Sequence, residues 1–400
     1  MVKAVIPQGW AQRIQQELVG NILPFWIRHT VDEVNGGFYG ALTNDLRIMN
    51  DVERSAVLCA RVLWTYATAY RVFRDEHYLQ VARHAYDYLT QRFWDANYGG
   101  MYWALDYRGK PVNDRKHVYA QAFAIYGLSE FYRATLEPDS LRLAQELFGL
   151  IETHTFDAAN QGNLECRDRE WQPLDDMRLS AKDLNCTKSM NTLLHLMEAY
   201  TNLMRVWDNA ALRAKQKGLV QVFFQHIVDP QTWHLKLFFD EAWRSLSDEI
   251  SYGHNIEASW LLVEAAEVLG EPETLAQARA TAVQMAQAVY DEGREADGSV
   301  LYELTPHGLQ GDKHWWVQAE AVVGFYNAYQ ISGQSQFAEA AERCWSYIED
   351  KFVDHAHGDW FKLLNREGIP DANHVKVGAW ECPYHHSRAC FEMLTRLNGQ

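Results

Sequence analysis

Helical periodicity of two kinds alternates along this chain. Segments of the first kind are amphipathic and carry many charged and amide side chains, which predicts solvent-facing helices near residues 10–27, 76–93, 138–154, 209–228, 272–291 and 335–352. Segments of the second kind are rich in Ala, Leu, Tyr and Trp nearly all round, and lie near residues 54–74, 115–134, 187–207, 254–269, 314–331 and 384–397. A helix that is apolar on every side is typical of one that is covered on both sides. The pattern therefore predicts six outer and six inner helices.

An acidic turn and a short strand-like segment follow each outer helix. Successive turns are 63, 62, 72, 62 and 63 residues apart and are marked by Asp32, Asp95, Asp157, Asp229, Asp291 and Asp354. Extended pieces such as GGFYGALTND and GGMYWALDYRG come next, which predicts short hairpins. A period of this length indicates a repeat architecture.

Six such repeats close most simply into an all-α (α/α)6 barrel, with the β-hairpins gathered at one rim. An open solenoid is the alternative, but it needs polar capping repeats, and neither end of the chain resembles one. The chain also has no linker rich in Pro, Gly or Ser. We therefore expect residues 1–400 to form a single catalytic domain.

Composition narrows the range of partners. The formal net charge of −16 argues against binding to nucleic acid or to an anionic membrane, because both require basic patches. The first ten residues, MVKAVIPQGW, lack the apolar core of a signal peptide, and no apolar run is long enough to span a bilayer. The six cysteines form no CxxC pair, which is typical of reduced thiols. These features predict a cytoplasmic protein acting on a neutral small molecule. We expect it to be a monomer or a homodimer.

Candidate chemistry collects in the opening turns of the predicted inner helices. If the hairpins share one rim, the inner helices begin there and point these side chains toward one pocket: Arg61, Tyr119, His195, His254, Glu257, Trp316, Trp380, His385 and His386. His254 and Glu257 are three residues apart and share a helix face. The alternatives are that Arg61 is a buried ion-pair partner, that His195 is a core histidine and that the aromatic residues only fill the core. We expect solvated positions for the histidines of outer helices and turns, namely His77, His84, His154 and His355.

Sequence signatures for cofactors are absent. The segment HNIE is not the HExxH zinc motif, and there is no GxGxxG, GxxxxGK[ST] or GxSxG. We therefore expect neither a metal nor an organic cofactor.

The same segments resemble the N-acylglucosamine 2-epimerase superfamily, and within it most closely the cellobiose 2-epimerases. The resemblance covers nearly the whole chain and is carried by ARVLWTYATAYR, KHVYAQAFAIYGLSEFYRAT, KSMNTLLHLMEAYTNLMRVW, SYGHNIEASWLLVEAA, KHWWVQAEAVVGFYNAY and KVGAWECPYHHSRACFEM. It implies the (α/α)6 fold that the repeat count also predicts. Two positions depart from the family pattern. Leu193 stands where the family's cellobiose-specific members usually have a histidine two residues before His195, and His386 stands where they usually have asparagine. Because both adjoin proposed site residues, we expect them to affect substrate preference.

The resemblance implies cofactor-independent epimerisation at C2 of a reducing-end aldose in a β-1,4-linked disaccharide, such as cellobiose or lactose. Mannose 2-epimerases and mannose isomerases, which share the framework, are the alternative. The implied catalytic residues are His195, His254, His385, Arg61 and Glu257. Trp316 and Trp380 would stack on the sugar, and Tyr119, Asn191 and Asp183 would bind the substrate.

Physical chemistry supports these roles. The hydrogen at C2, next to an aldehyde, is a very weak acid, and its removal leaves an enediolate. A histidine supplies the base near neutral pH, and Arg61 can hold the developing oxyanion. Inversion at C2 requires proton transfer on both faces, which two histidines on different helices perform better than one. The rival enzyme is an inverting glycosidase that uses Glu257 with Asp183 or Glu320, separated by roughly 6.5–9.5 Å. The rival without catalysis is a repeat protein that binds a partner.

Overall fold

The computed structural model describes residues 9–399, and this part of the chain is mostly helical, which confirms the class predicted from the sequence. The segment 1–8, which carried most of the argument against a signal peptide, lies outside the described residues. The inner helices are α3 (Ala56–Phe73), α5 (Val118–Thr135), α7 (Met190–Met204), α9 (Tyr252–Leu269), α11 (Trp315–Ser332) and α13 (Tyr384–Asn398). The outer helices are α1 (Trp10–Glu17) continued by α2 (Leu23–His29), then α4 (Glu76–Tyr88), α6 (Pro138–His154), α8 (Ala210–Val222), α10 (Pro272–Ala288) and α12 (Ser335–Tyr347).

Several outer helices contain one wider turn. These five-residue π-helical turns are η1 (Leu18–Ile22), between α1 and α2, and, at the ends of α4, α8, α10 and α12, η2 (Leu89–Phe93), η3 (Phe223–Ile227), η4 (Val289–Gly293) and η5 (Ile348–Phe352). They account for the length of the predicted outer helices, whose expected ends include these turns.

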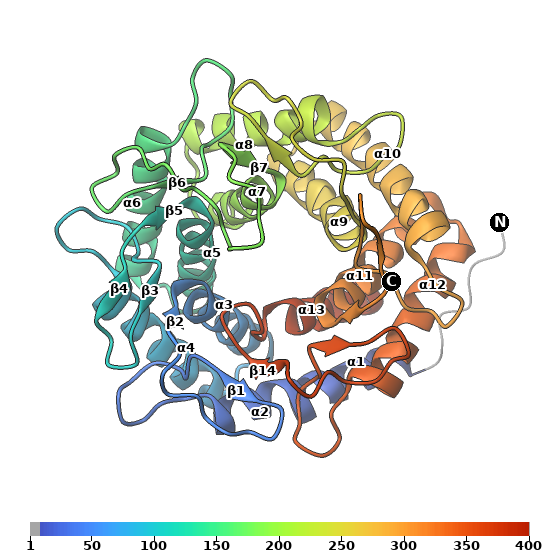
Figure 1. The fold of residues 1–400 in the computed structure, drawn as a ribbon, viewed down its shortest axis with the longest axis horizontal. Helices are drawn as coiled ribbons and strands as arrows, with labels where there is room; N and C mark the ends of the chain where they lie inside the picture. The colour runs from blue at the N-terminus through green and yellow to red at the C-terminus, as the bar shows by residue number, and fades with distance from the viewer. Residues whose placement is uncertain (1–8, 400) are drawn as a thin grey trace.

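The inner helices form a closed ring, seen end-on in Figure 1. Each inner helix packs against the next in chain order, from α3 to α13, and α13 returns to pack against α3. Every inner helix is also covered by an outer one, and α1, at the start of the chain, covers α13, at its end. Both termini of the described chain therefore take part in closing the ring.

Short strands link neighbouring repeats at one rim. A two- or three-residue strand lies before each inner helix, and we call these the lead-in strands: β2 (Arg54–Ser55), β5 (Lys116–His117), β7 (Lys188–Ser189), β9 (Ile250–Ser251), β12 (Lys313–His314) and β14 (Val375–Val377). Each pairs with a strand of the following repeat, respectively β3 (Ala104–Leu105), β6 (Cys166–Arg167), β8 (Phe238–Phe239), β10 (Glu303–Thr305), β13 (Leu363–Leu364) and β1 (Leu42–Thr43). Hairpins within one repeat form where β3 pairs with β4 (Pro111–Asn113) and β10 with β11 (Gly308–Gln310). Isolated antiparallel bridges, such as Val31 with Phe38 and Trp94 with Met101, also close a tight turn within each repeat. The predicted hairpins are therefore present, and the lead-in strands add pairing between neighbouring repeats.

Buried ion pairs fix the lead-in strands to the acidic turns. Lys116 lies 3.1 Å from Asp95, and Lys188 lies 2.7 Å from Asp157. Both lysines are fully buried, and a buried charge is tolerable only when it is paired. The same pairing joins Arg54 to Asp32, Lys376 to Asp354 and, in the fifth repeat, Lys313 to Glu295.

The fifth acidic turn was placed wrongly from the sequence. Asp291 lies inside η4, and Glu295 occupies the turn, where its backbone N–H donates to Ser299 O and its carbonyl accepts from Gly298. The π-helical turn carries the outer helix past Asp291, so the regular spacing of aspartates pointed to the wrong residue.

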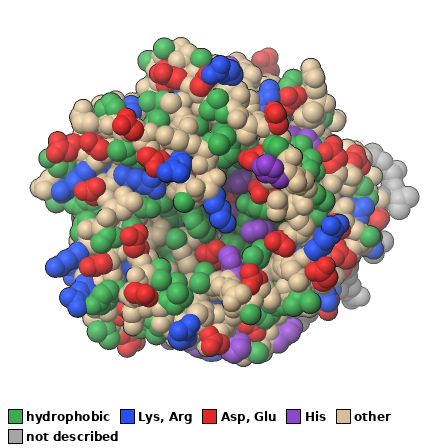
Figure 2. Space-filling view, in the orientation of Figure 1, with side chains coloured by type: hydrophobic (Ala, Val, Ile, Leu, Met, Phe, Trp, Pro, Cys, Tyr) green, Lys and Arg blue, Asp and Glu red, His purple; other side chains and the backbone are tan. Residues whose placement is uncertain are grey.

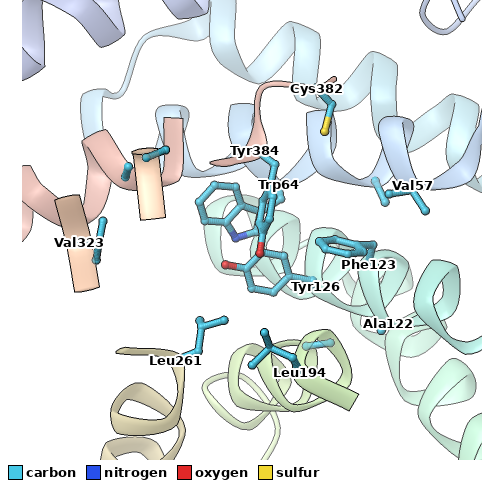
Figure 3. Close-up of a cluster of buried hydrophobic side chains, with 14 of the residues drawn as sticks. Val57, Trp64, Ala122, Phe123, Tyr126, Leu194, Leu261, Val323, Cys382 and Tyr384 are labelled. Carbon is cyan, nitrogen blue, oxygen red and sulfur yellow. The ribbon is translucent and has the colours of Figure 1, made fainter. Parts of the chain in front are cut away.

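Aromatic side chains close the middle of the ring. Trp64 stacks on Tyr126 with ring centroids 5.2 Å apart and planes 10° apart, and Tyr384 meets Trp64 edge-on at 5.7 Å (Figure 3). Near the C-terminal ends of the inner helices, polar side chains form two hydrogen-bonded sets. The first joins α3, α5, α7 and α9 through Arg71, Glu130, Arg133, Asn202, Arg205 and Glu264, and the second joins α11 and α13 through Asn327, Gln330, Glu392 and Arg396. The ring is therefore filled at its centre and at the end opposite the lead-in strands.

Two further observations concern membrane-spanning helices and the cysteines. Within residues 9–399, no helix is both long and apolar enough to cross a membrane. All six cysteines are buried and unpaired.

Candidate functional site

A pocket of about 440 Å³ opens among the lead-in strands, at the N-terminal ends of the inner helices. The surface is hollowed near its centre in this view, and histidine side chains lie in and around the hollow (Figure 2). The predicted site residues His254, Asn191 and Asp183 line the pocket. Its volume lies within the range typical of small-molecule sites.

His254 lies in the first turn of α9, which Ser251 caps. The Ser251 hydroxyl is 2.7 Å from His254 Nδ1, and the imidazole lies 4.8 Å from the Trp316 ring, centroid to centroid. Burial lowers the pKa of His254 to about 3, and the nearby His195 lowers it further in the same direction. The free imidazole is therefore neutral at physiological pH, whereas the sequence alone suggested a pKa near neutrality.

His385 lies at the start of α13 and bonds a buried carboxylate. Its Nδ1 is 2.7 Å from Glu320 Oε1 and 3.9 Å from Glu257 Oε1, and its ring lies 5.4 Å from that of Trp316. Burial holds the pKa of His385 well below its usual value, and the positive charges of Arg61 and Arg388 act in the same direction. Trp316 thus contacts both His254 and His385.

His195, on α7, has the same kind of partner. Its Nδ1 is 3.0 Å from Glu198 Oε2, and its ring meets Tyr119 edge-on at 5.1 Å. Burial lowers the pKa of His195 to about 4, although Glu198 opposes this shift. In all three histidines Nδ1 is bound by the protein, while no described residue hydrogen-bonds Nε2. Each ring therefore has one nitrogen free for a substrate.

Arg61 is buried among aromatic rings. Its Nη2 donates to the Tyr119 hydroxyl at 2.8 Å, and its guanidinium carbon lies 4.1 Å from the centroid of Phe123 and 4.6 Å from that of Tyr384. Within residues 9–399 no carboxylate pairs with Arg61, and its Nε has no hydrogen-bond partner. The ion-pair interpretation of Arg61 is therefore wrong, and the guanidinium keeps hydrogen-bonding capacity and an unbalanced charge beside the histidines.

Glu257 belongs to a cluster of buried carboxylates that the sequence analysis recognised only in part. Glu198, Glu257 and Glu320, which we call the carboxylate cluster, all bond the guanidinium of Arg388. Burial and the adjacent Glu320 raise the pKa of Glu257 to about 8, and Arg388 opposes that shift. Glu257 Oε2 is buried without a partner.

Helix spacing could have revealed the missed members of this cluster. Glu198 is three residues after His195, and Arg388 is three residues after His385, which is the spacing that joins His254 to Glu257. On three inner helices, a histidine in the opening turns is thus followed, on the same face, by a charged residue. From the sequence, this relationship was recognised only for His254 and Glu257.

Glu257, Glu320 and His385 are the residues, within 9–399, whose donor atoms lie close enough to hold a metal, within 4.8 Å of one another. Arg388 Nη2 lies 2.6 Å from Glu257 Oε1 and 2.7 Å from Glu320 Oε1. A guanidinium thus already occupies the position in which a cation would meet both carboxylates. The donor set fits Arg388 better than a metal ion.

The remaining predicted substrate-binding residues are Trp380, Asn191 and Asp183, of which Asn191 and Asp183 line the pocket. Trp380 is half-buried, with ring centroids 5.6 Å from Tyr119 and 6.2 Å from Trp103. Asn191 Oδ1 is a buried acceptor without a partner, which suits a sugar hydroxyl. Asp183 lies in the loop over the pocket and accepts a 2.8 Å hydrogen bond from Ser180 N–H.

The outer wall of the pocket contains residues that the sequence analysis missed. Tyr302 stacks on His314 with centroids 3.9 Å apart, and both line the pocket together with His374. The sequence could have indicated His314, because this residue immediately precedes an inner helix. The wall extends the aromatic surface from Trp316, which meets Tyr302 edge-on at 6.2 Å, toward the rim.

The two departures from the family pattern point away from the pocket, contrary to expectation. Leu193 is fully buried and faces the turn at Gly162, on the outer side of α7. His386 is also fully buried, and its Nε2 is 2.7 Å from Asp359 Oδ1 in the outer layer. Adjacent residues on a helix point about 100° apart, so proximity in sequence did not place these side chains in the site.

The histidines expected at the surface divide into two groups. His77 and His355 are exposed. His84 and His154 are only half-buried: His84 Nε2 is 2.9 Å from Gly37 O, and His154 stacks on Trp171 at 5.1 Å.

Comparisons with known proteins identify the family. The family model of N-acylglucosamine 2-epimerase matches residues 37–389. The chain is 46% identical to the cellobiose 2-epimerase of Bacteroides fragilis (96% of this chain, 98% of the relative) and 39% identical to that of Ruminococcus albus (96% and 98%). It is also similar to the structure of the cellobiose 2-epimerase from Bacillus thermoamylovorans, with a TM-score of 0.93 and 38% identity over 98% of this chain and 100% of the other. The chain therefore belongs to the N-acylglucosamine 2-epimerase family.

Proposed function

We propose that this protein is a cofactor-independent sugar epimerase that inverts C2 of the reducing-end aldose in a β-1,4-linked disaccharide, converting cellobiose to glucosyl-mannose and lactose to epilactose. The observation that carries the proposal is the set of three imidazoles from three inner helices, each with Nδ1 bound and Nε2 free, beside an arginine without a carboxylate partner. Relatives named for this activity, 46% and 39% identical over nearly the whole chain, support it.

The proposal extends to the fold, the cofactors and the oligomeric state. We infer that the closed ring of inner helices and its covering outer helices are a single (α/α)6-barrel domain. The barrel holds no organic cofactor or metal, and works in the cytoplasm as a monomer or homodimer. One continuous core cluster, running from Trp10 to Leu394, supports the single domain.

The first chemical step is removal of the C2 proton from the open-chain aldose. In our proposal Nε2 of one histidine, His254 or His385, takes this proton, and the electrons of the C–H bond form the C1–C2 double bond of a cis-enediolate. The negative charge moves to O1, where Arg61 and the Tyr119 hydroxyl act as donors. Because the enediolate is anionic, it raises the proton affinity of the neighbouring imidazoles and offsets the effect of their burial.

The second step returns a proton to the opposite face of C2. The histidine that did not act as base takes up a proton from solvent at Nε2 once the enediolate has formed, and donates it to C2 as the C1–C2 double bond becomes the new C–H bond and O1 returns to the aldehyde. The first histidine then releases its proton to solvent, and the two roles exchange in the reverse reaction. His195, beside Tyr119 and Arg61, is placed to move protons on O1 or O5 during ring opening and closing. Trp316 and Trp380 hold the sugar ring in place.

The pocket favours a substrate larger than a monosaccharide. It extends beyond His254 to Tyr302, His314 and His374, which leaves an aromatic wall for a second ring. Action on free mannose or glucose, by epimerisation or by isomerisation, is the alternative.

One candidate carboxylate pair, Glu257 with Glu320, does not have the geometry of an inverting glycosidase. The donor atoms of Glu257 and Glu320 lie within 4.8 Å of each other, and both bond Arg388 Nη2. An inverting pair requires about 6.5–9.5 Å and room for a water molecule between them. A protein that only binds a partner has no need for three imidazoles that each keep Nε2 free beside an arginine without a carboxylate partner in the described chain.

The test is to incubate the protein with cellobiose, lactose, glucose and mannose in separate reactions and to identify the products by NMR. We expect mannose-type signals at the reducing end of both disaccharides. Free glucose from cellobiose would instead indicate a glycosidase. A higher kcat/KM for free mannose than for cellobiose would favour the monosaccharide enzyme.

A further inference from the structure

Arg388 links two of the site histidines from below the pocket. Its Nη1 bonds Glu198, whose other carboxylate oxygen lies 3.0 Å from His195 Nδ1. Its Nη2 lies 2.7 Å from Glu320 Oε1, which itself lies 2.7 Å from His385 Nδ1. A continuous set of hydrogen bonds therefore runs from His195 on α7, through Arg388, to His385 on α13.

The surroundings hold Arg388 in one orientation. The guanidinium carbon lies 4.2 Å from the ring centroid of Tyr384 and 4.8 Å from that of Trp260. The Trp260 indole donates to Glu320 Oε2 at 3.0 Å, and the Tyr384 hydroxyl donates to Glu198. Arg388 and the carboxylate cluster are all buried, so water cannot replace any of these bonds.

The third histidine lies outside this network. His254 Nδ1 is bound by the Ser251 hydroxyl, which neither contacts Arg388 nor carries a charge. An ionised carboxylate can only accept, so in that form Glu198 and Glu320 require the proton on Nδ1 of His195 and His385 and leave Nε2 as the basic nitrogen. Burial favours the protonated form of both carboxyls, and Arg388 opposes it: the pKa of Glu198 is lowered to about 2, whereas that of Glu320 stays above its usual value, so Glu320 depends on Arg388 to remain an acceptor. A serine hydroxyl can donate or accept, so it does not fix the tautomer of His254 in this way.

We propose that Arg388 is a positioning residue for the reaction: by holding Glu198 and Glu320, it fixes His195 and His385 in the Nδ1–H tautomer, with Nε2 directed at the substrate. This inference rests on the proposed function for its kinetic consequence, but not for its structural one. The planar guanidinium is needed because it meets carboxylates on different helices at the same time, which a lysine ammonium, a point charge on a flexible stem, does poorly.

The competing explanation is that Arg388 only stabilises the fold. Removing it would then lower the melting temperature and leave both the tautomers and the kinetics of the folded protein unchanged. A buried arginine that meets three carboxylates has such a role in any case, so a stability measurement alone does not separate the two explanations.

The test uses Arg388→Lys, which keeps the positive charge, and Arg388→Gln, which removes it. Protein labelled with ¹⁵N-histidine reports the tautomer of each ring through long-range ¹H–¹⁵N correlations, with signals assigned by single histidine substitutions. We expect His195 and His385 to lose the pure Nδ1–H tautomer in both variants, while His254 keeps its wild-type spectrum as an internal control. In the lysine variant we expect kcat for cellobiose epimerisation to fall at least tenfold, with KM within about threefold of wild type.

Arg396→Lys is the matched control. Arg396 lies on the same helix, two turns further on, and bonds Glu392, Asn327 and Gln330 instead of the carboxylate cluster. Its guanidinium carbon is 6.0 Å from the Trp260 ring, so its replacement also reports any effect that passes through Trp260 alone. This variant should lower the melting temperature and leave the histidine spectra and kcat as in wild type. If neither Arg388 variant folds, Glu198→Gln and Glu320→Gln should each release one histidine, His195 and His385 respectively.

The possible results distinguish failure of the Arg388 proposal from failure of the proposed function. Unchanged tautomers in a folded Arg388 variant would overturn the proposal, and so would changed tautomers with an unchanged kcat. If wild-type protein epimerises no sugar, the proposed function fails, while the spectra still decide whether Arg388 fixes the two rings.

Discussion

The Arg61 guanidinium donates to the hydroxyl of Tyr119 at 2.8 Å, and the two side chains come from adjacent inner helices, α3 and α5. Tyr119 is a neutral partner, and burial raises its pKa well above the usual range. The positive charge of Arg61 is therefore not balanced by a carboxylate within ion-pair distance in the described chain. An arginine in this condition is suited to an anion that forms only during the reaction.

The first prediction concerns Arg61→Lys. Lysine keeps the charge but loses the planar donor pair, so it cannot bond Tyr119 and the enediolate oxygen at once. We expect kcat for cellobiose epimerisation to fall on the order of a hundredfold or more, as for the loss of one oxyanion donor. Steady-state kinetics with NMR detection measure this loss.

Arg71→Lys is the control for that measurement. Arg71 lies on the same helix and pairs with Glu130 at 2.6 Å, near the end opposite the pocket. It should epimerise at close to the wild-type rate. An Arg61→Lys enzyme at the wild-type rate would assign Arg61 a purely structural role.

The second prediction tests the two-base mechanism at His254 and His385. Both contact Trp316, and they come from inner helices separated by α11, so a sugar between them can meet one imidazole on each face of C2. In deuterated water, the wild-type product should carry deuterium at C2, because the returning proton comes from the second histidine. Mass spectrometry and NMR of the product measure this incorporation.

Single substitutions should separate the two bases. His254→Asn and His385→Asn should each abolish epimerisation, while each retains exchange of the C2 proton in one epimer, glucose-type for one variant and mannose-type for the other. Product that retains the substrate's own C2 hydrogen would indicate a single base that serves both faces.

The sequence predicted relationships within a single helix, but not relationships between helices. Periodicity along one helix predicted the inner helices, and an opening-turn position placed His254 and His385 at the pocket end. Relationships between helices were out of reach: no pattern within α7 or α11 indicates that Glu198 and Glu320 meet at Arg388 of α13. These contacts depend on ring closure, which brings residues about 190 positions apart within hydrogen-bond distance.

The wrong expectations have a similar cause, because a residue's position in the sequence does not by itself give its side-chain direction or its burial. Leu193 and His386 adjoin site residues in sequence but face the outer layer, because consecutive side chains on a helix point in different directions. The histidine pKa values were taken from exposed reference groups, and burial lowers the value of His254 to about 3.

The third prediction is metal independence. Arg388 occupies the space between Glu257 and Glu320, the two carboxylates nearest to forming a metal site. Activity should therefore survive dialysis against EDTA. A loss of activity that a divalent cation restores would contradict both this prediction and the assignment of the carboxylate cluster to Arg388.

The fourth prediction concerns substrate preference. His386→Asn introduces the residue usual in the family, yet His386 bonds Asp359 in the outer layer. We expect the ratio of kcat/KM for cellobiose to that for mannose to stay within about threefold of wild type, while the melting temperature falls because a buried hydrogen bond is lost. Trp380→Ala, at a half-buried ring beside Tyr119, is the contrasting variant and should lower kcat/KM for cellobiose strongly. A large change of preference in His386→Asn would show that the outer layer controls the pocket.

The last prediction concerns pH and stability at Glu165. This buried residue lines the pocket, and its carboxyl accepts from the backbone N–H of Ser189 at 2.6 Å and from the Thr192 hydroxyl at 2.6 Å. Burial raises its pKa to about 8, and these hydrogen bonds oppose the shift. A pKa raised by folding means that the fold favours the protonated form. The stability that this form contributes is therefore complete below about pH 4.5 and is lost as the pH rises through about 8.

Glu165→Gln removes that dependence, because an amide does not ionise. The melting temperature of the variant relative to wild type should rise by about 2–5 °C between pH 5 and pH 9. Glu33→Gln, at an exposed position, serves as the control. Differential scanning calorimetry across this pH range measures both. A constant difference between Glu165→Gln and wild type would mean that Glu165 is ionised in the folded protein throughout. In that case Ser189 and Thr192 would stabilise the charge at the N-terminus of α7 more than burial disfavours it.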